Sequence, residues 1–386
     1  MKKGWEYKKL KDVALYSIGL TYKPSDVNEE GTIVLRSSNI QNDKLDLNDI
    51  VKVSCPIKES LYVQKDDILM CSRNGSAKLV GKVALIPEIK ERMTYGTFMM
   101  VIRSVYNPYL FYYFKSENFR NQIKHGEANM INQITRYMLD DVYLYVPPLS
   151  EQQRIVDYLD AAFAKIDAMK ANAEKALNEA KALFQASLKE MLEPKEGWEE
   201  KTIGEVSLLK SGNSDANKSK PGSLPYVKVG DMNLKGNETY ITVSSTYVDR
   251  QDNIKNIFPI GTLIFPKRGG AIFTNKKRLT EIEICCDLNV MGVIPNKNSV
   301  LPLFLYYFFN TIDFNIFKDE GASIPQINNK NIAPIMICLP SLSEQQSIVE
   351  TLDSLKSKVD RLQANFEKIS QECDALKQAI LRQIFE

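Results

Sequence analysis

The 386-residue sequence contains a single histidine, and this scarcity excludes several kinds of catalytic site. Histidine is the commonest general base and a frequent metal ligand, so one histidine cannot build a His-rich metal centre. A Ser-His-Asp triad would have to use that residue, His125, which stands beside a glycine in FRNQIKHGEAN. We interpret His125 as a cation near the C-terminus of a helix, where the helix dipole favours positive charge.

Cysteine pairs and long apolar runs are also lacking. The chain has no CxxC pair, and adjacent cysteines rarely form a disulfide or a zinc site, so we expect all cysteines to be reduced and mostly buried. The first residues, MKKGWEYKKL, have no apolar stretch typical of a signal peptide. No run of ~18 apolar residues predicts a transmembrane helix. We therefore expect a cytoplasmic protein without a metal site or membrane association. The six cysteines are Cys55, Cys71, Cys285, Cys286, Cys338 and Cys373.

Nucleotide and cofactor loops are missing as well. No GxxxxGK(S/T) phosphate loop is present, and no FxGxG loop for S-adenosylmethionine or convincing PD-(D/E)xK nuclease motif was found. Asn107-Pro108-Tyr109 resembles a fragment of the NPP(F/Y) motif of DNA methyltransferases, but the second proline is absent. Its counterpart in the repeat described below is Leu301-Pro302-Leu303, so we interpret the proline as the start of a helix. The sequence therefore predicts a non-catalytic chain.

An internal repeat organises the sequence. GWEYKKLKDVA begins at Gly4 and GWEEKTIGEVS at Gly197, while LSEQQRIV begins at Leu149 and LSEQQSIV at Leu342. Both pairs are offset by 193 residues, half of the 386-residue length. Weaker matches between these anchors slip by one or two residues, as loop insertions within a shared fold would produce. The sequence therefore predicts two copies of one unit whose side chains differ.

Each copy begins with a module of short apolar runs, such as TIVLR and DILMC, that are broken by Gly, Pro, Asn and Asp. Such runs predict strands and turns. The segment PYLFYYFKSENFRNQI and its counterpart predict a short helix. We therefore expect a mixed α+β module at residues 1–147 (module 1) and a similar one at residues 194–340 (module 2).

A long helix is expected after each module, at residues 148–193 and 341–386. Proline and glycine are absent after LSEQQ until Pro194 in the first copy, and from the remainder of the second copy. Helices of this length without breakers are typical of coiled coils. We expect a capping box and a hydrophobic staple to start each helix. The residues are Ser150, Gln153 and Leu149 in the first helix, and Ser343, Gln346 and Leu342 in the second.

Apolar residues recur along both helices at alternating spacings of four and three, the 3.5-residue period of a coiled-coil seam. Because the first seam is rich in alanine and the second in large residues, the two are expected to pack together as an antiparallel pair within one chain. A parallel homodimer, or two helices packing separately on their own modules, are the alternatives. The first seam contains Ile155, Leu159, Ala162, Ile166, Met169, Ala173, Ala176, Ala180, Leu183 and Ser187. The second contains Ile348, Leu352, Leu355, Val359, Leu362, Phe366, Ile369, Cys373, Leu376 and Ile380.

Two unlike modules on a stiff helical spacer suit a DNA target with two separated half-sites. An α-helix of about 37 residues spans about 55 Å, whereas B-DNA advances ~34 Å per turn. Each helix segment carries six Lys/Arg and eight Asp/Glu, so the helices contribute −4 to a net charge of +2. The remaining +6 lies on the modules, where phosphate contacts require it. We therefore expect an asymmetric, bipartite DNA site.

Polar residues in turns are the candidate DNA contacts, because a glycine-flanked arginine turn can approach a phosphate or a guanine edge. Any one of them can equally be a solvated loop residue, and their recurrence in both copies favours DNA binding. In module 1 they are Arg36, Ser38, Asn39, Arg73, Asn74, Asn132, Gln133 and Arg136. In module 2 they are Lys228, Lys267, Arg268, Lys276, Lys277, Arg278, Gln326, Asn328 and Lys330.

These features resemble the specificity subunits of type I restriction-modification enzymes over essentially the whole chain. The resemblance is carried by GWE near the start of each copy, by the turns in VLRSSNI and VKVGDM, by DILM and TLIF before arginine- and glycine-containing turns, and by LSEQQ-x-IV. It implies two α+β target-recognition domains, related by a pseudo-two-fold axis and separated by an antiparallel coiled coil. VGDM departs from the commoner VSNI form. This puts a DNA-binding role for Asp231 in doubt, since a carboxylate repels phosphate but can accept from cytosine.

The resemblance also implies partners. Two methylation subunits would carry the S-adenosylmethionine site, and restriction subunits would supply ATP- and Mg-dependent translocation and cleavage. The chain itself, with no cofactor, would bind double-stranded DNA and direct adenine methylation or restriction. The main alternative is a coiled-coil scaffold whose modules bind proteins. A fused methyltransferase-specificity protein is a second, and the missing cofactor loop argues against it.

Overall fold

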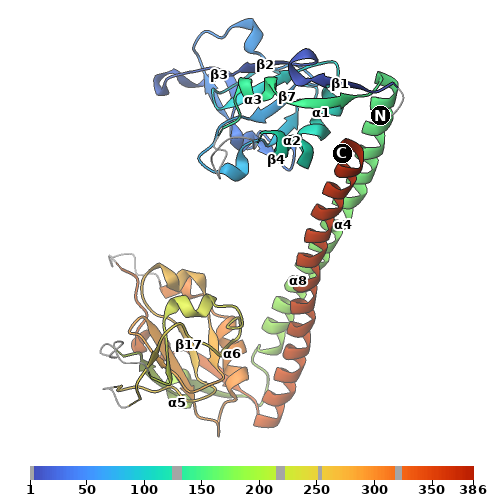
Figure 1. Ribbon diagram of the computed structural model, residues 1–386. Helices are drawn as coiled ribbons and strands as arrows, with labels where there is room; N and C mark the ends of the chain where they lie inside the picture. Colours follow the sequence, from blue (N-terminus) through green and yellow to red (C-terminus); the bar gives the residue numbers. More distant parts are fainter. Residues whose placement is uncertain (1–3, 124–132, 214–221, 251–253, 318–323) are drawn as a thin grey trace. The chain divides into compact units, whose positions relative to one another are not determined.

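The chain folds into two compact units, seen in the computed structural model of Figure 1. The structure describes residues 4–123, 133–213, 222–250, 254–317 and 324–386. Unit 1 comprises Met1–Glu174 and Phe366–Glu386, and unit 2 comprises Lys175–Asn365. Each unit therefore combines one module with segments of both long helices.

Module 1 is an α+β structure of small sheets and short helices. Its strands are β1 (Glu6–Lys9), β2 (Leu15–Ile18), β3 (Val27–Leu35), β4 (Ile40–Gln41), β5 (Lys44–Leu45), β6 (Val51–Val53), β7 (Ile68–Cys71), β8 (Val83–Leu85), β9 (Met93–Tyr95), β10 (Met99–Arg103) and β11 (Tyr143–Val146). Its helices are α1 (Asn107–Phe114), α2 (Glu117–Ile123) and α3 (Arg136–Asp140). The main sheet has the antiparallel order β2-β10-β7-β8. In a second sheet β3 pairs antiparallel with β6 and parallel with β9.

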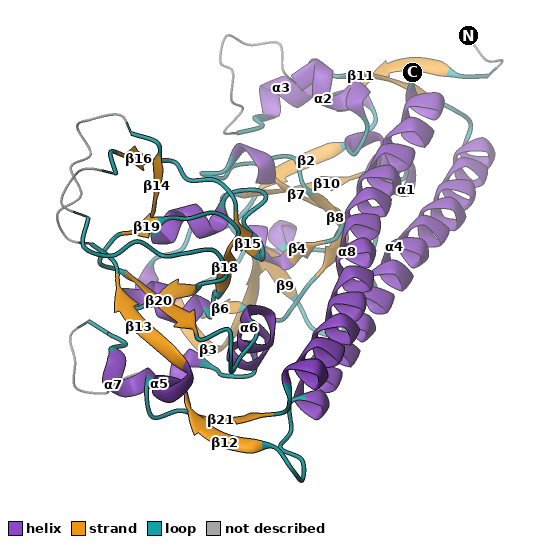
Figure 2. Cartoon of the chain, turned by 90° about the horizontal axis from the view of Figure 1, so that it is seen from below, coloured by secondary structure: helices purple, strands orange, loops and turns teal. Residues whose placement is uncertain are grey.

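Module 2 repeats this topology (Figure 2). Its strands are β12 (Glu199–Thr202), β13 (Ser207–Ser211), β14 (Leu224–Val227), β15 (Tyr240–Ile241), β16 (Tyr247–Val248), β17 (Leu263–Pro266), β18 (Arg278–Thr280), β19 (Cys285–Cys286), β20 (Val290–Pro295) and β21 (Met336–Leu339). Its helices are α5 (Ile203–Val206), α6 (Pro302–Asn310) and α7 (Asn329–Ile332). The main sheet is β13-β20-β17-β18-β15, and β14 pairs antiparallel with β16 and parallel with β19.

The terminal strands of each module also pair in the same way. β1 is antiparallel to β11 in module 1, and β12 is antiparallel to β21 in module 2. Apart from β4 and β5 of module 1 and β15 of module 2, each strand of one module thus has a counterpart in the other with the same neighbours and direction. The expected α+β fold of two similar modules is therefore confirmed.

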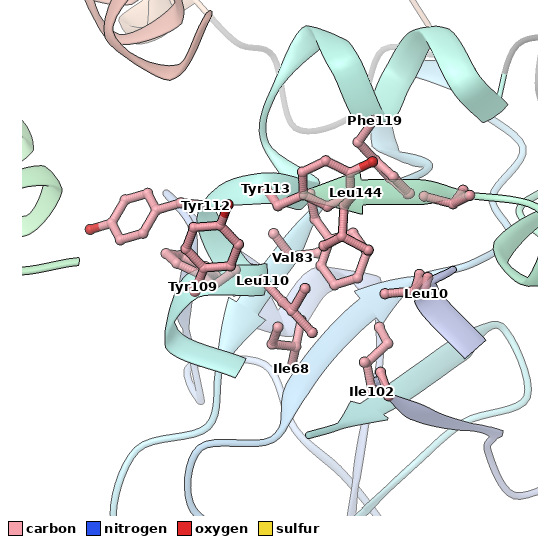
Figure 3. Packing of buried hydrophobic residues seen from close by; sticks show 14 of the residues in the cluster. Leu10, Ile68, Val83, Ile102, Tyr109, Leu110, Tyr112, Tyr113, Phe119 and Leu144 are labelled. Carbon is pink, nitrogen blue, oxygen red and sulfur yellow. The ribbon is translucent and has the colours of Figure 1, made fainter. Parts of the chain in front are cut away.

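Aromatic helices anchor the core of each module. The sequence PYLFYYF places proline in the first turn of α1, where its missing N–H costs no hydrogen bond. Tyr109, Tyr113 and Phe114 of this helix are each 1% exposed. They pack over the main sheet with Leu10, Ile68 and Ile102, as the close view in Figure 3 shows for part of the cluster. A short helix that is apolar on every side is stable only when buried in this way.

The long helices α4 (Leu149–Met191) and α8 (Leu342–Phe385) lie side by side (Figures 1 and 2) and contact each other in antiparallel order within each unit. In unit 1, Lys170 Nζ lies 3.6 Å from an Asp374 carboxylate oxygen, and Lys377 Nζ lies 2.5 Å from Asp167. In unit 2, Lys181 Nζ donates to Gln363 Oε1 at 2.8 Å. Residues with higher numbers in α4 thus contact residues with lower numbers in α8, as antiparallel helices require. No helix among the described residues has the length and apolarity needed to cross a membrane.

The buried stripe of these helices departs from the expected seam at alternate positions. Met169, Leu183 and Leu376 were expected in the seam and are 58%, 60% and 48% exposed, so their assignment was wrong. Leu159, Ile166, Ile348, Leu352 and Cys373 are buried. Ile155, Leu355, Val359, Leu362, Phe366, Ile369 and Ile380 are partly buried.

The stripe of α4 instead uses neighbouring residues. Phe163, Leu177 and Leu188 are buried, each one position after an expected seam residue. In α8 the stem of Lys377 takes the place expected for Leu376, with its ammonium 5.2 Å from the centroid of the Phe163 ring. Two stripes with the same 3.5-residue period share Leu159 and Ile166, and packing against the module selects between them.

The expected start of each long helix was also wrong. Because α4 begins at Leu149 and α8 at Leu342, Ser150 and Ser343 lie inside the first turn and do not cap it. Leu149 is 60% exposed and Leu342 is 38% exposed, so neither forms a staple. In α8 the hydroxyl of Ser341 accepts from the Glu344 N–H at 3.3 Å.

The glutamines of SEQQ have two different roles. Gln153 and Gln346 donate to carboxylates one turn further along their helices, at 2.8 and 2.9 Å, rather than back to a cap. Gln152 and Gln345 are 3% and 0% exposed. Their amides donate to the carbonyls of Pro147 and Pro340, which fixes the chain as it enters each helix.

A tyrosine–aspartate pair ties each module to the long helix that follows it. The Tyr112 hydroxyl of α1 donates to Asp160 of α4 in unit 1, and the Tyr307 hydroxyl of α6 donates to Asp353 of α8 in unit 2. Burial and the adjacent carboxylate raise the pKa of both phenols, so both remain protonated donors at neutral pH. The same contact therefore joins module and helix in both copies.

Candidate nucleic-acid interface

Backbone hydrogen bonds gather three turns at one end of the main sheet of module 1. The turns are residues 36–39, 72–76 and 96–98, which we call the three turns of module 1. The Gly96 N–H donates to the carbonyl that precedes Arg36, at 2.9 Å, and the Arg73 N–H donates to the Phe98 carbonyl at 3.1 Å. Arg73 and Gln133 form a bridge, so residues far apart in sequence converge on one surface.

Module 2 builds the same framework from different residues. Its three turns are residues 228–231, 267–270 and 287–289. The Asp287 N–H donates to the Val227 carbonyl at 3.1 Å, and the Lys267 N–H donates to the Asn289 carbonyl at 2.8 Å. Arg268 and Gln326 form the bridge equivalent to that of Arg73 and Gln133. The framework is thus common to both copies, whereas its side chains are not.

Most of the candidate DNA contacts lie on or beside these turns with accessible side chains. Asn132 lies outside the described residues, as does His125. The exposed candidates are Arg73, Gln133, Arg136, Arg268, Gln326, Asn328 and Lys330. The partly buried ones are Arg36, Ser38, Asn74, Lys228, Lys267 and Lys276, and the hydroxyl of Ser38 is itself buried.

Several of the partly buried candidates also bind to neighbouring turns. The Asn74 amide donates to the Ser37 hydroxyl at 3.2 Å, which joins the first and second turns. An Arg36 nitrogen lies 2.9 Å from the Asp49 carboxylate. In module 2, Lys228 Nζ donates to the Thr246 hydroxyl at 3.0 Å. These contacts position the cations beside the turns.

Asn39 was expected to contact DNA, and this prediction was wrong. The residue is fully buried and supports the turn from within. Its Oδ1 accepts from the Arg36 N–H at 2.8 Å, and its Nδ2 donates to the carbonyls of Asp46 and Asp49, both at 2.8 Å. With every polar atom engaged by the backbone, Asn39 cannot contact DNA.

Asp231 holds the equivalent turn of module 2 and is 3% exposed. Its carboxylate accepts from the backbone N–H groups of Lys228 at 2.8 Å and Ser245 at 3.1 Å, and from the Ser244 hydroxyl at 3.3 Å. The neighbours of Asp231 are donors, whereas two neighbours of Asn39 are acceptors. This difference explains why VGDM replaces the VSNI form without placing a negative charge on the surface.

The Lys276–Arg278 run was also expected to contact DNA, but its side chains bind within the module. Lys277 is 3% exposed, and its ammonium donates to the Ile312 carbonyl at 2.8 Å and lies 4.1 Å from the Phe314 ring centroid. Burial lowers the pKa of Lys277 to about 8. The Arg278 guanidinium donates to three carbonyls, including that of Met232 at 3.2 Å. Lys277 and Arg278 are therefore structural, and Lys276 pairs with the Asn233 side chain.

The second turn of module 2 concentrates positive charge. Lys267 Nζ donates to the Ser211 hydroxyl at 2.7 Å. Burial, with the nearby Arg268 guanidinium, lowers the pKa of Lys267. Desolvation is the main cause of the shift, and the like charge of the exposed Arg268 guanidinium adds to it, so two cations stand side by side in this turn. This turn is therefore suited to bind an anion.

Two exposed apolar residues of these surfaces were missed in the sequence analysis. Phe98 is 56% exposed and Leu288 is 42% exposed, and each lies in the third turn of its module. Only polar residues had been considered as DNA contacts. The two residues do not occupy equivalent places, because the Phe98 carbonyl corresponds to that of Asn289 by its hydrogen bonds, so no shared pattern in the repeat identifies them.

Known proteins match this chain over its full length. The StySPI type I restriction enzyme specificity subunit of Salmonella potsdam is 25% identical over 419 residues, which cover 100% of this chain and 89% of the relative. The EcoKI specificity subunit of Escherichia coli strain K12 is 24% identical over 428 residues, with the same coverage of 100% and 89%.

Solved structures show the same fold. A chain from a study of complex assembly and conformational transition in the type I R-M system has a TM-score of 0.75 at 19% identity, covering 99% of this chain and 97% of that one. The HsdS subunit from Thermoanaerobacter tengcongensis has a TM-score of 0.58 at 20% identity, covering 100% and 97%. The sequence model of the type I restriction modification DNA specificity domain matches residues 2–179 and 195–371, once in each copy. The resemblance found in the sequence is therefore confirmed, and the chain belongs to the type I restriction-modification specificity subunit family.

Proposed function

We propose that this chain reads an asymmetric, bipartite DNA site and directs adenine methylation or restriction at that site by partner subunits, without a catalytic centre of its own. Module 1 would read one half-site and module 2 the other. The partners would be two methylation subunits, which bind S-adenosylmethionine, and restriction subunits, which use ATP and Mg. The site of action would be the cytoplasm.

One observation carries the proposal. The three turns of each module share a backbone framework, while the side chains on them differ at equivalent places. Ser72 in module 1 corresponds to Lys267 in module 2 by hydrogen bonds to the third turn and to the residues next to Gln133 and Gln326, whereas the adjacent Arg73 and Arg268 are alike. A fixed scaffold with variable polar groups is what direct readout of two different base sequences requires.

The helices support the bipartite part of the proposal. α4 is a continuous helix of 43 residues between the two modules in sequence, about 65 Å long at ~1.5 Å per residue. Two DNA-binding modules on a helical connection of this length would contact separate half-sites, with unread base pairs between them. The excess of acidic residues in both helices makes them unsuitable for phosphate contact, and leaves that role to the modules.

Mapping of methylated adenine in a host that expresses the chain with its methylation subunits tests this function. We expect one bipartite sequence with two unlike halves. Exchanging residues 1–147 for another module should change one half of that sequence only. A change in both halves, or methylation without any sequence preference, would refute the modular reading of DNA.

A scaffold that binds proteins through both modules is the competing function. A gel shift of the complete complex on the mapped duplex and on a scrambled duplex separates the two functions. The DNA-reading function predicts a salt-sensitive complex with preference for the mapped duplex. A scaffold predicts no DNA complex on either duplex at moderate salt.

A further inference from the structure

The third turn of module 1 presents Phe98 to solvent on a rigid backbone. The Phe98 carbonyl accepts three hydrogen bonds, from the Ser72 N–H at 3.0 Å, the Ser72 hydroxyl at 3.0 Å and the Arg73 N–H at 3.1 Å. The ring itself is 56% exposed. These bonds fix the backbone of the turn, and the exposed part of the ring is available to a ligand.

A cation stands beside the ring. The guanidinium carbon of Arg73 lies 5.5 Å from the Phe98 ring centroid, within the range of a cation–π contact. Arg73 is itself exposed. The surface therefore pairs one apolar group with a donor suited to phosphate or to a guanine edge.

Module 2 also carries an exposed apolar residue in its third turn, one place earlier in the turn than Phe98. Leu288 is 42% exposed in the third turn, between Asp287 and Asn289. The turn is fixed by the Asn289 N–H, which donates to the Asp287 side chain at 3.0 Å, and by the Asn289 carbonyl, which accepts from the Lys267 N–H at 2.8 Å. Arg268 follows Lys267 directly. Both copies thus keep an exposed apolar side chain next to a basic turn, although the sequences of the turns differ.

We infer that Phe98 and Leu288 each contact the C5-methyl group of a thymine, one in each half-site; this inference rests on the proposed function. The thymine methyl is the apolar group that a base pair presents in the major groove, whereas the other base atoms there are hydrogen-bond donors and acceptors. Water exposure of Phe98 is unfavourable in the free chain and would be relieved by this contact. Phe98 and Leu288 would therefore specify thymine by its methyl group rather than by a hydrogen bond.

Replacement of single thymines by deoxyuridine isolates the methyl group, because it leaves every hydrogen-bonding group of the base unchanged. The complete complex of the chain with its methylation subunits would be titrated with the mapped duplex and with duplexes that carry one such replacement each. Burial of one methyl-sized group is worth about 0.8 kcal/mol, so one replacement in the first half-site should weaken binding about four-fold. One replacement in the second half-site should have a similar effect.

The two side chains are then removed one at a time. In Phe98→Ala the deoxyuridine effect in the first half-site should disappear while that in the second remains, and Leu288→Ala should give the reverse. Val105→Ala is the matched control, since Val105 is 77% exposed at the opposite end of β10 and should leave both effects intact. Because all three residues are exposed, thermal unfolding should match that of the parent chain.

The outcomes distinguish the inference from the function. Sequence-specific binding in which no deoxyuridine replacement weakens the complex overturns the inference and leaves the function standing. A deoxyuridine effect that persists in Phe98→Ala assigns the methyl contact to another residue and also overturns it. Failure of the parent complex to prefer the mapped duplex would instead remove the proposed function.

Discussion

Exchanging the side chains of Asn39 and Asp231 tests whether the first turn of each module is held by its buried polar residue. Two carbonyl oxygens, of Asp46 and Asp49, each accept from Asn39 Nδ2 at 2.8 Å. In Asn39→Asp a carboxylate oxygen faces both carbonyls, so both lose their donor while the new charge is buried against two negative dipoles. The acceptor for the Arg36 N–H survives, so the change removes donors alone.

The magnitude follows from the number of groups left unpaired. A buried polar group without a partner costs about 1–3 kcal/mol, so two orphaned carbonyls cost about 2–6 kcal/mol. We expect Asn39→Asp to lower the free energy of unfolding of unit 1 by about 3–5 kcal/mol, within the range for buried polar substitutions. Burial raises the folded-state pKa of the new carboxyl group, so the loss should shrink as pH falls through that pKa and the group regains a proton to donate.

The reciprocal change acts on unit 2. In Asp231→Asn an amide NH2 replaces one of two oxygens that accept backbone N–H groups, those of Lys228 and Ser245. One N–H is left facing a donor, so we expect a loss of about 1–3 kcal/mol. Both substitutions are thus expected to destabilise their units, because Asn39 faces two hydrogen-bond acceptors and Asp231 faces donors.

The two tryptophans of the chain allow each unit to be followed separately. Trp5 lies in unit 1 and Trp198 in unit 2. Urea unfolding would be recorded by fluorescence in a Trp198→Phe background for unit 1 and in a Trp5→Phe background for unit 2. Asn28→Asp is the control, since Asn28 is exposed and its substitution should cost less than about 0.5 kcal/mol. An Asn39→Asp chain that unfolds like its control, or that shifts only the Trp198 signal, would refute the reasoning.

Three further predictions follow from burial. Leu177→Asp should lower the stability of unit 2 by more than about 3 kcal/mol and reduce helicity in circular dichroism, because Leu177 is 3% exposed. Leu183→Asp, at 60% exposure, should change stability by less than about 1 kcal/mol; equal effects of the two would contradict the observed stripe. Tyr307→Phe should destabilise unit 2 by about 1–2 kcal/mol in urea unfolding, because the hydroxyl loses its bond to Asp353, and a neutral result would deny that contact a structural role. The pKa of Lys277 is lowered from 10.5 to about 8 in the folded state. Between these pH values the unfolded chain keeps the proton that the folded chain has lost, so the free energy of unfolding rises as pH increases from about 8 to 10.5. Lys277→Met should remove this rise, which can be measured as the pH dependence of the difference in unfolding free energy; an unchanged dependence would contradict the assignment.

The duplicated motifs predicted the fold because they are local in sequence and repeat at a fixed offset. GWE and LSEQQ mark the same elements in both halves, and the long helices follow from the absence of proline and glycine. The side of each helix that is buried was harder to predict. Ala176 and Leu177 are neighbours in α4 and both are compatible with an apolar stripe, so only tertiary packing shows that Leu177 is the buried one.

The candidate site was predicted in outline and not in detail. Arg73 and Gln133 were each expected as candidate DNA contacts, and their β-bridge places them together. Asn39 and Lys277 are polar residues in apparently exposed turns, yet they are buried because distant carbonyls accept their hydrogen bonds. No local pattern contains those carbonyls, so the sequence could not separate a residue that supports a turn from one that the turn presents.

Completion of unit 1 depends on residues made after all of unit 2. Leu381 is 0% exposed within the core of unit 1, and the Phe385 ring lies 5.2 Å from Tyr109 and 5.6 Å from Tyr113 between ring centroids. During translation, module 1 therefore leaves the ribosome with an open apolar face that stays uncovered until residues 366–386 emerge. A premature stop codon that removes those residues would destabilise unit 1, although module 1 is encoded first. We expect chaperones that bind exposed apolar surface to act on this face during translation.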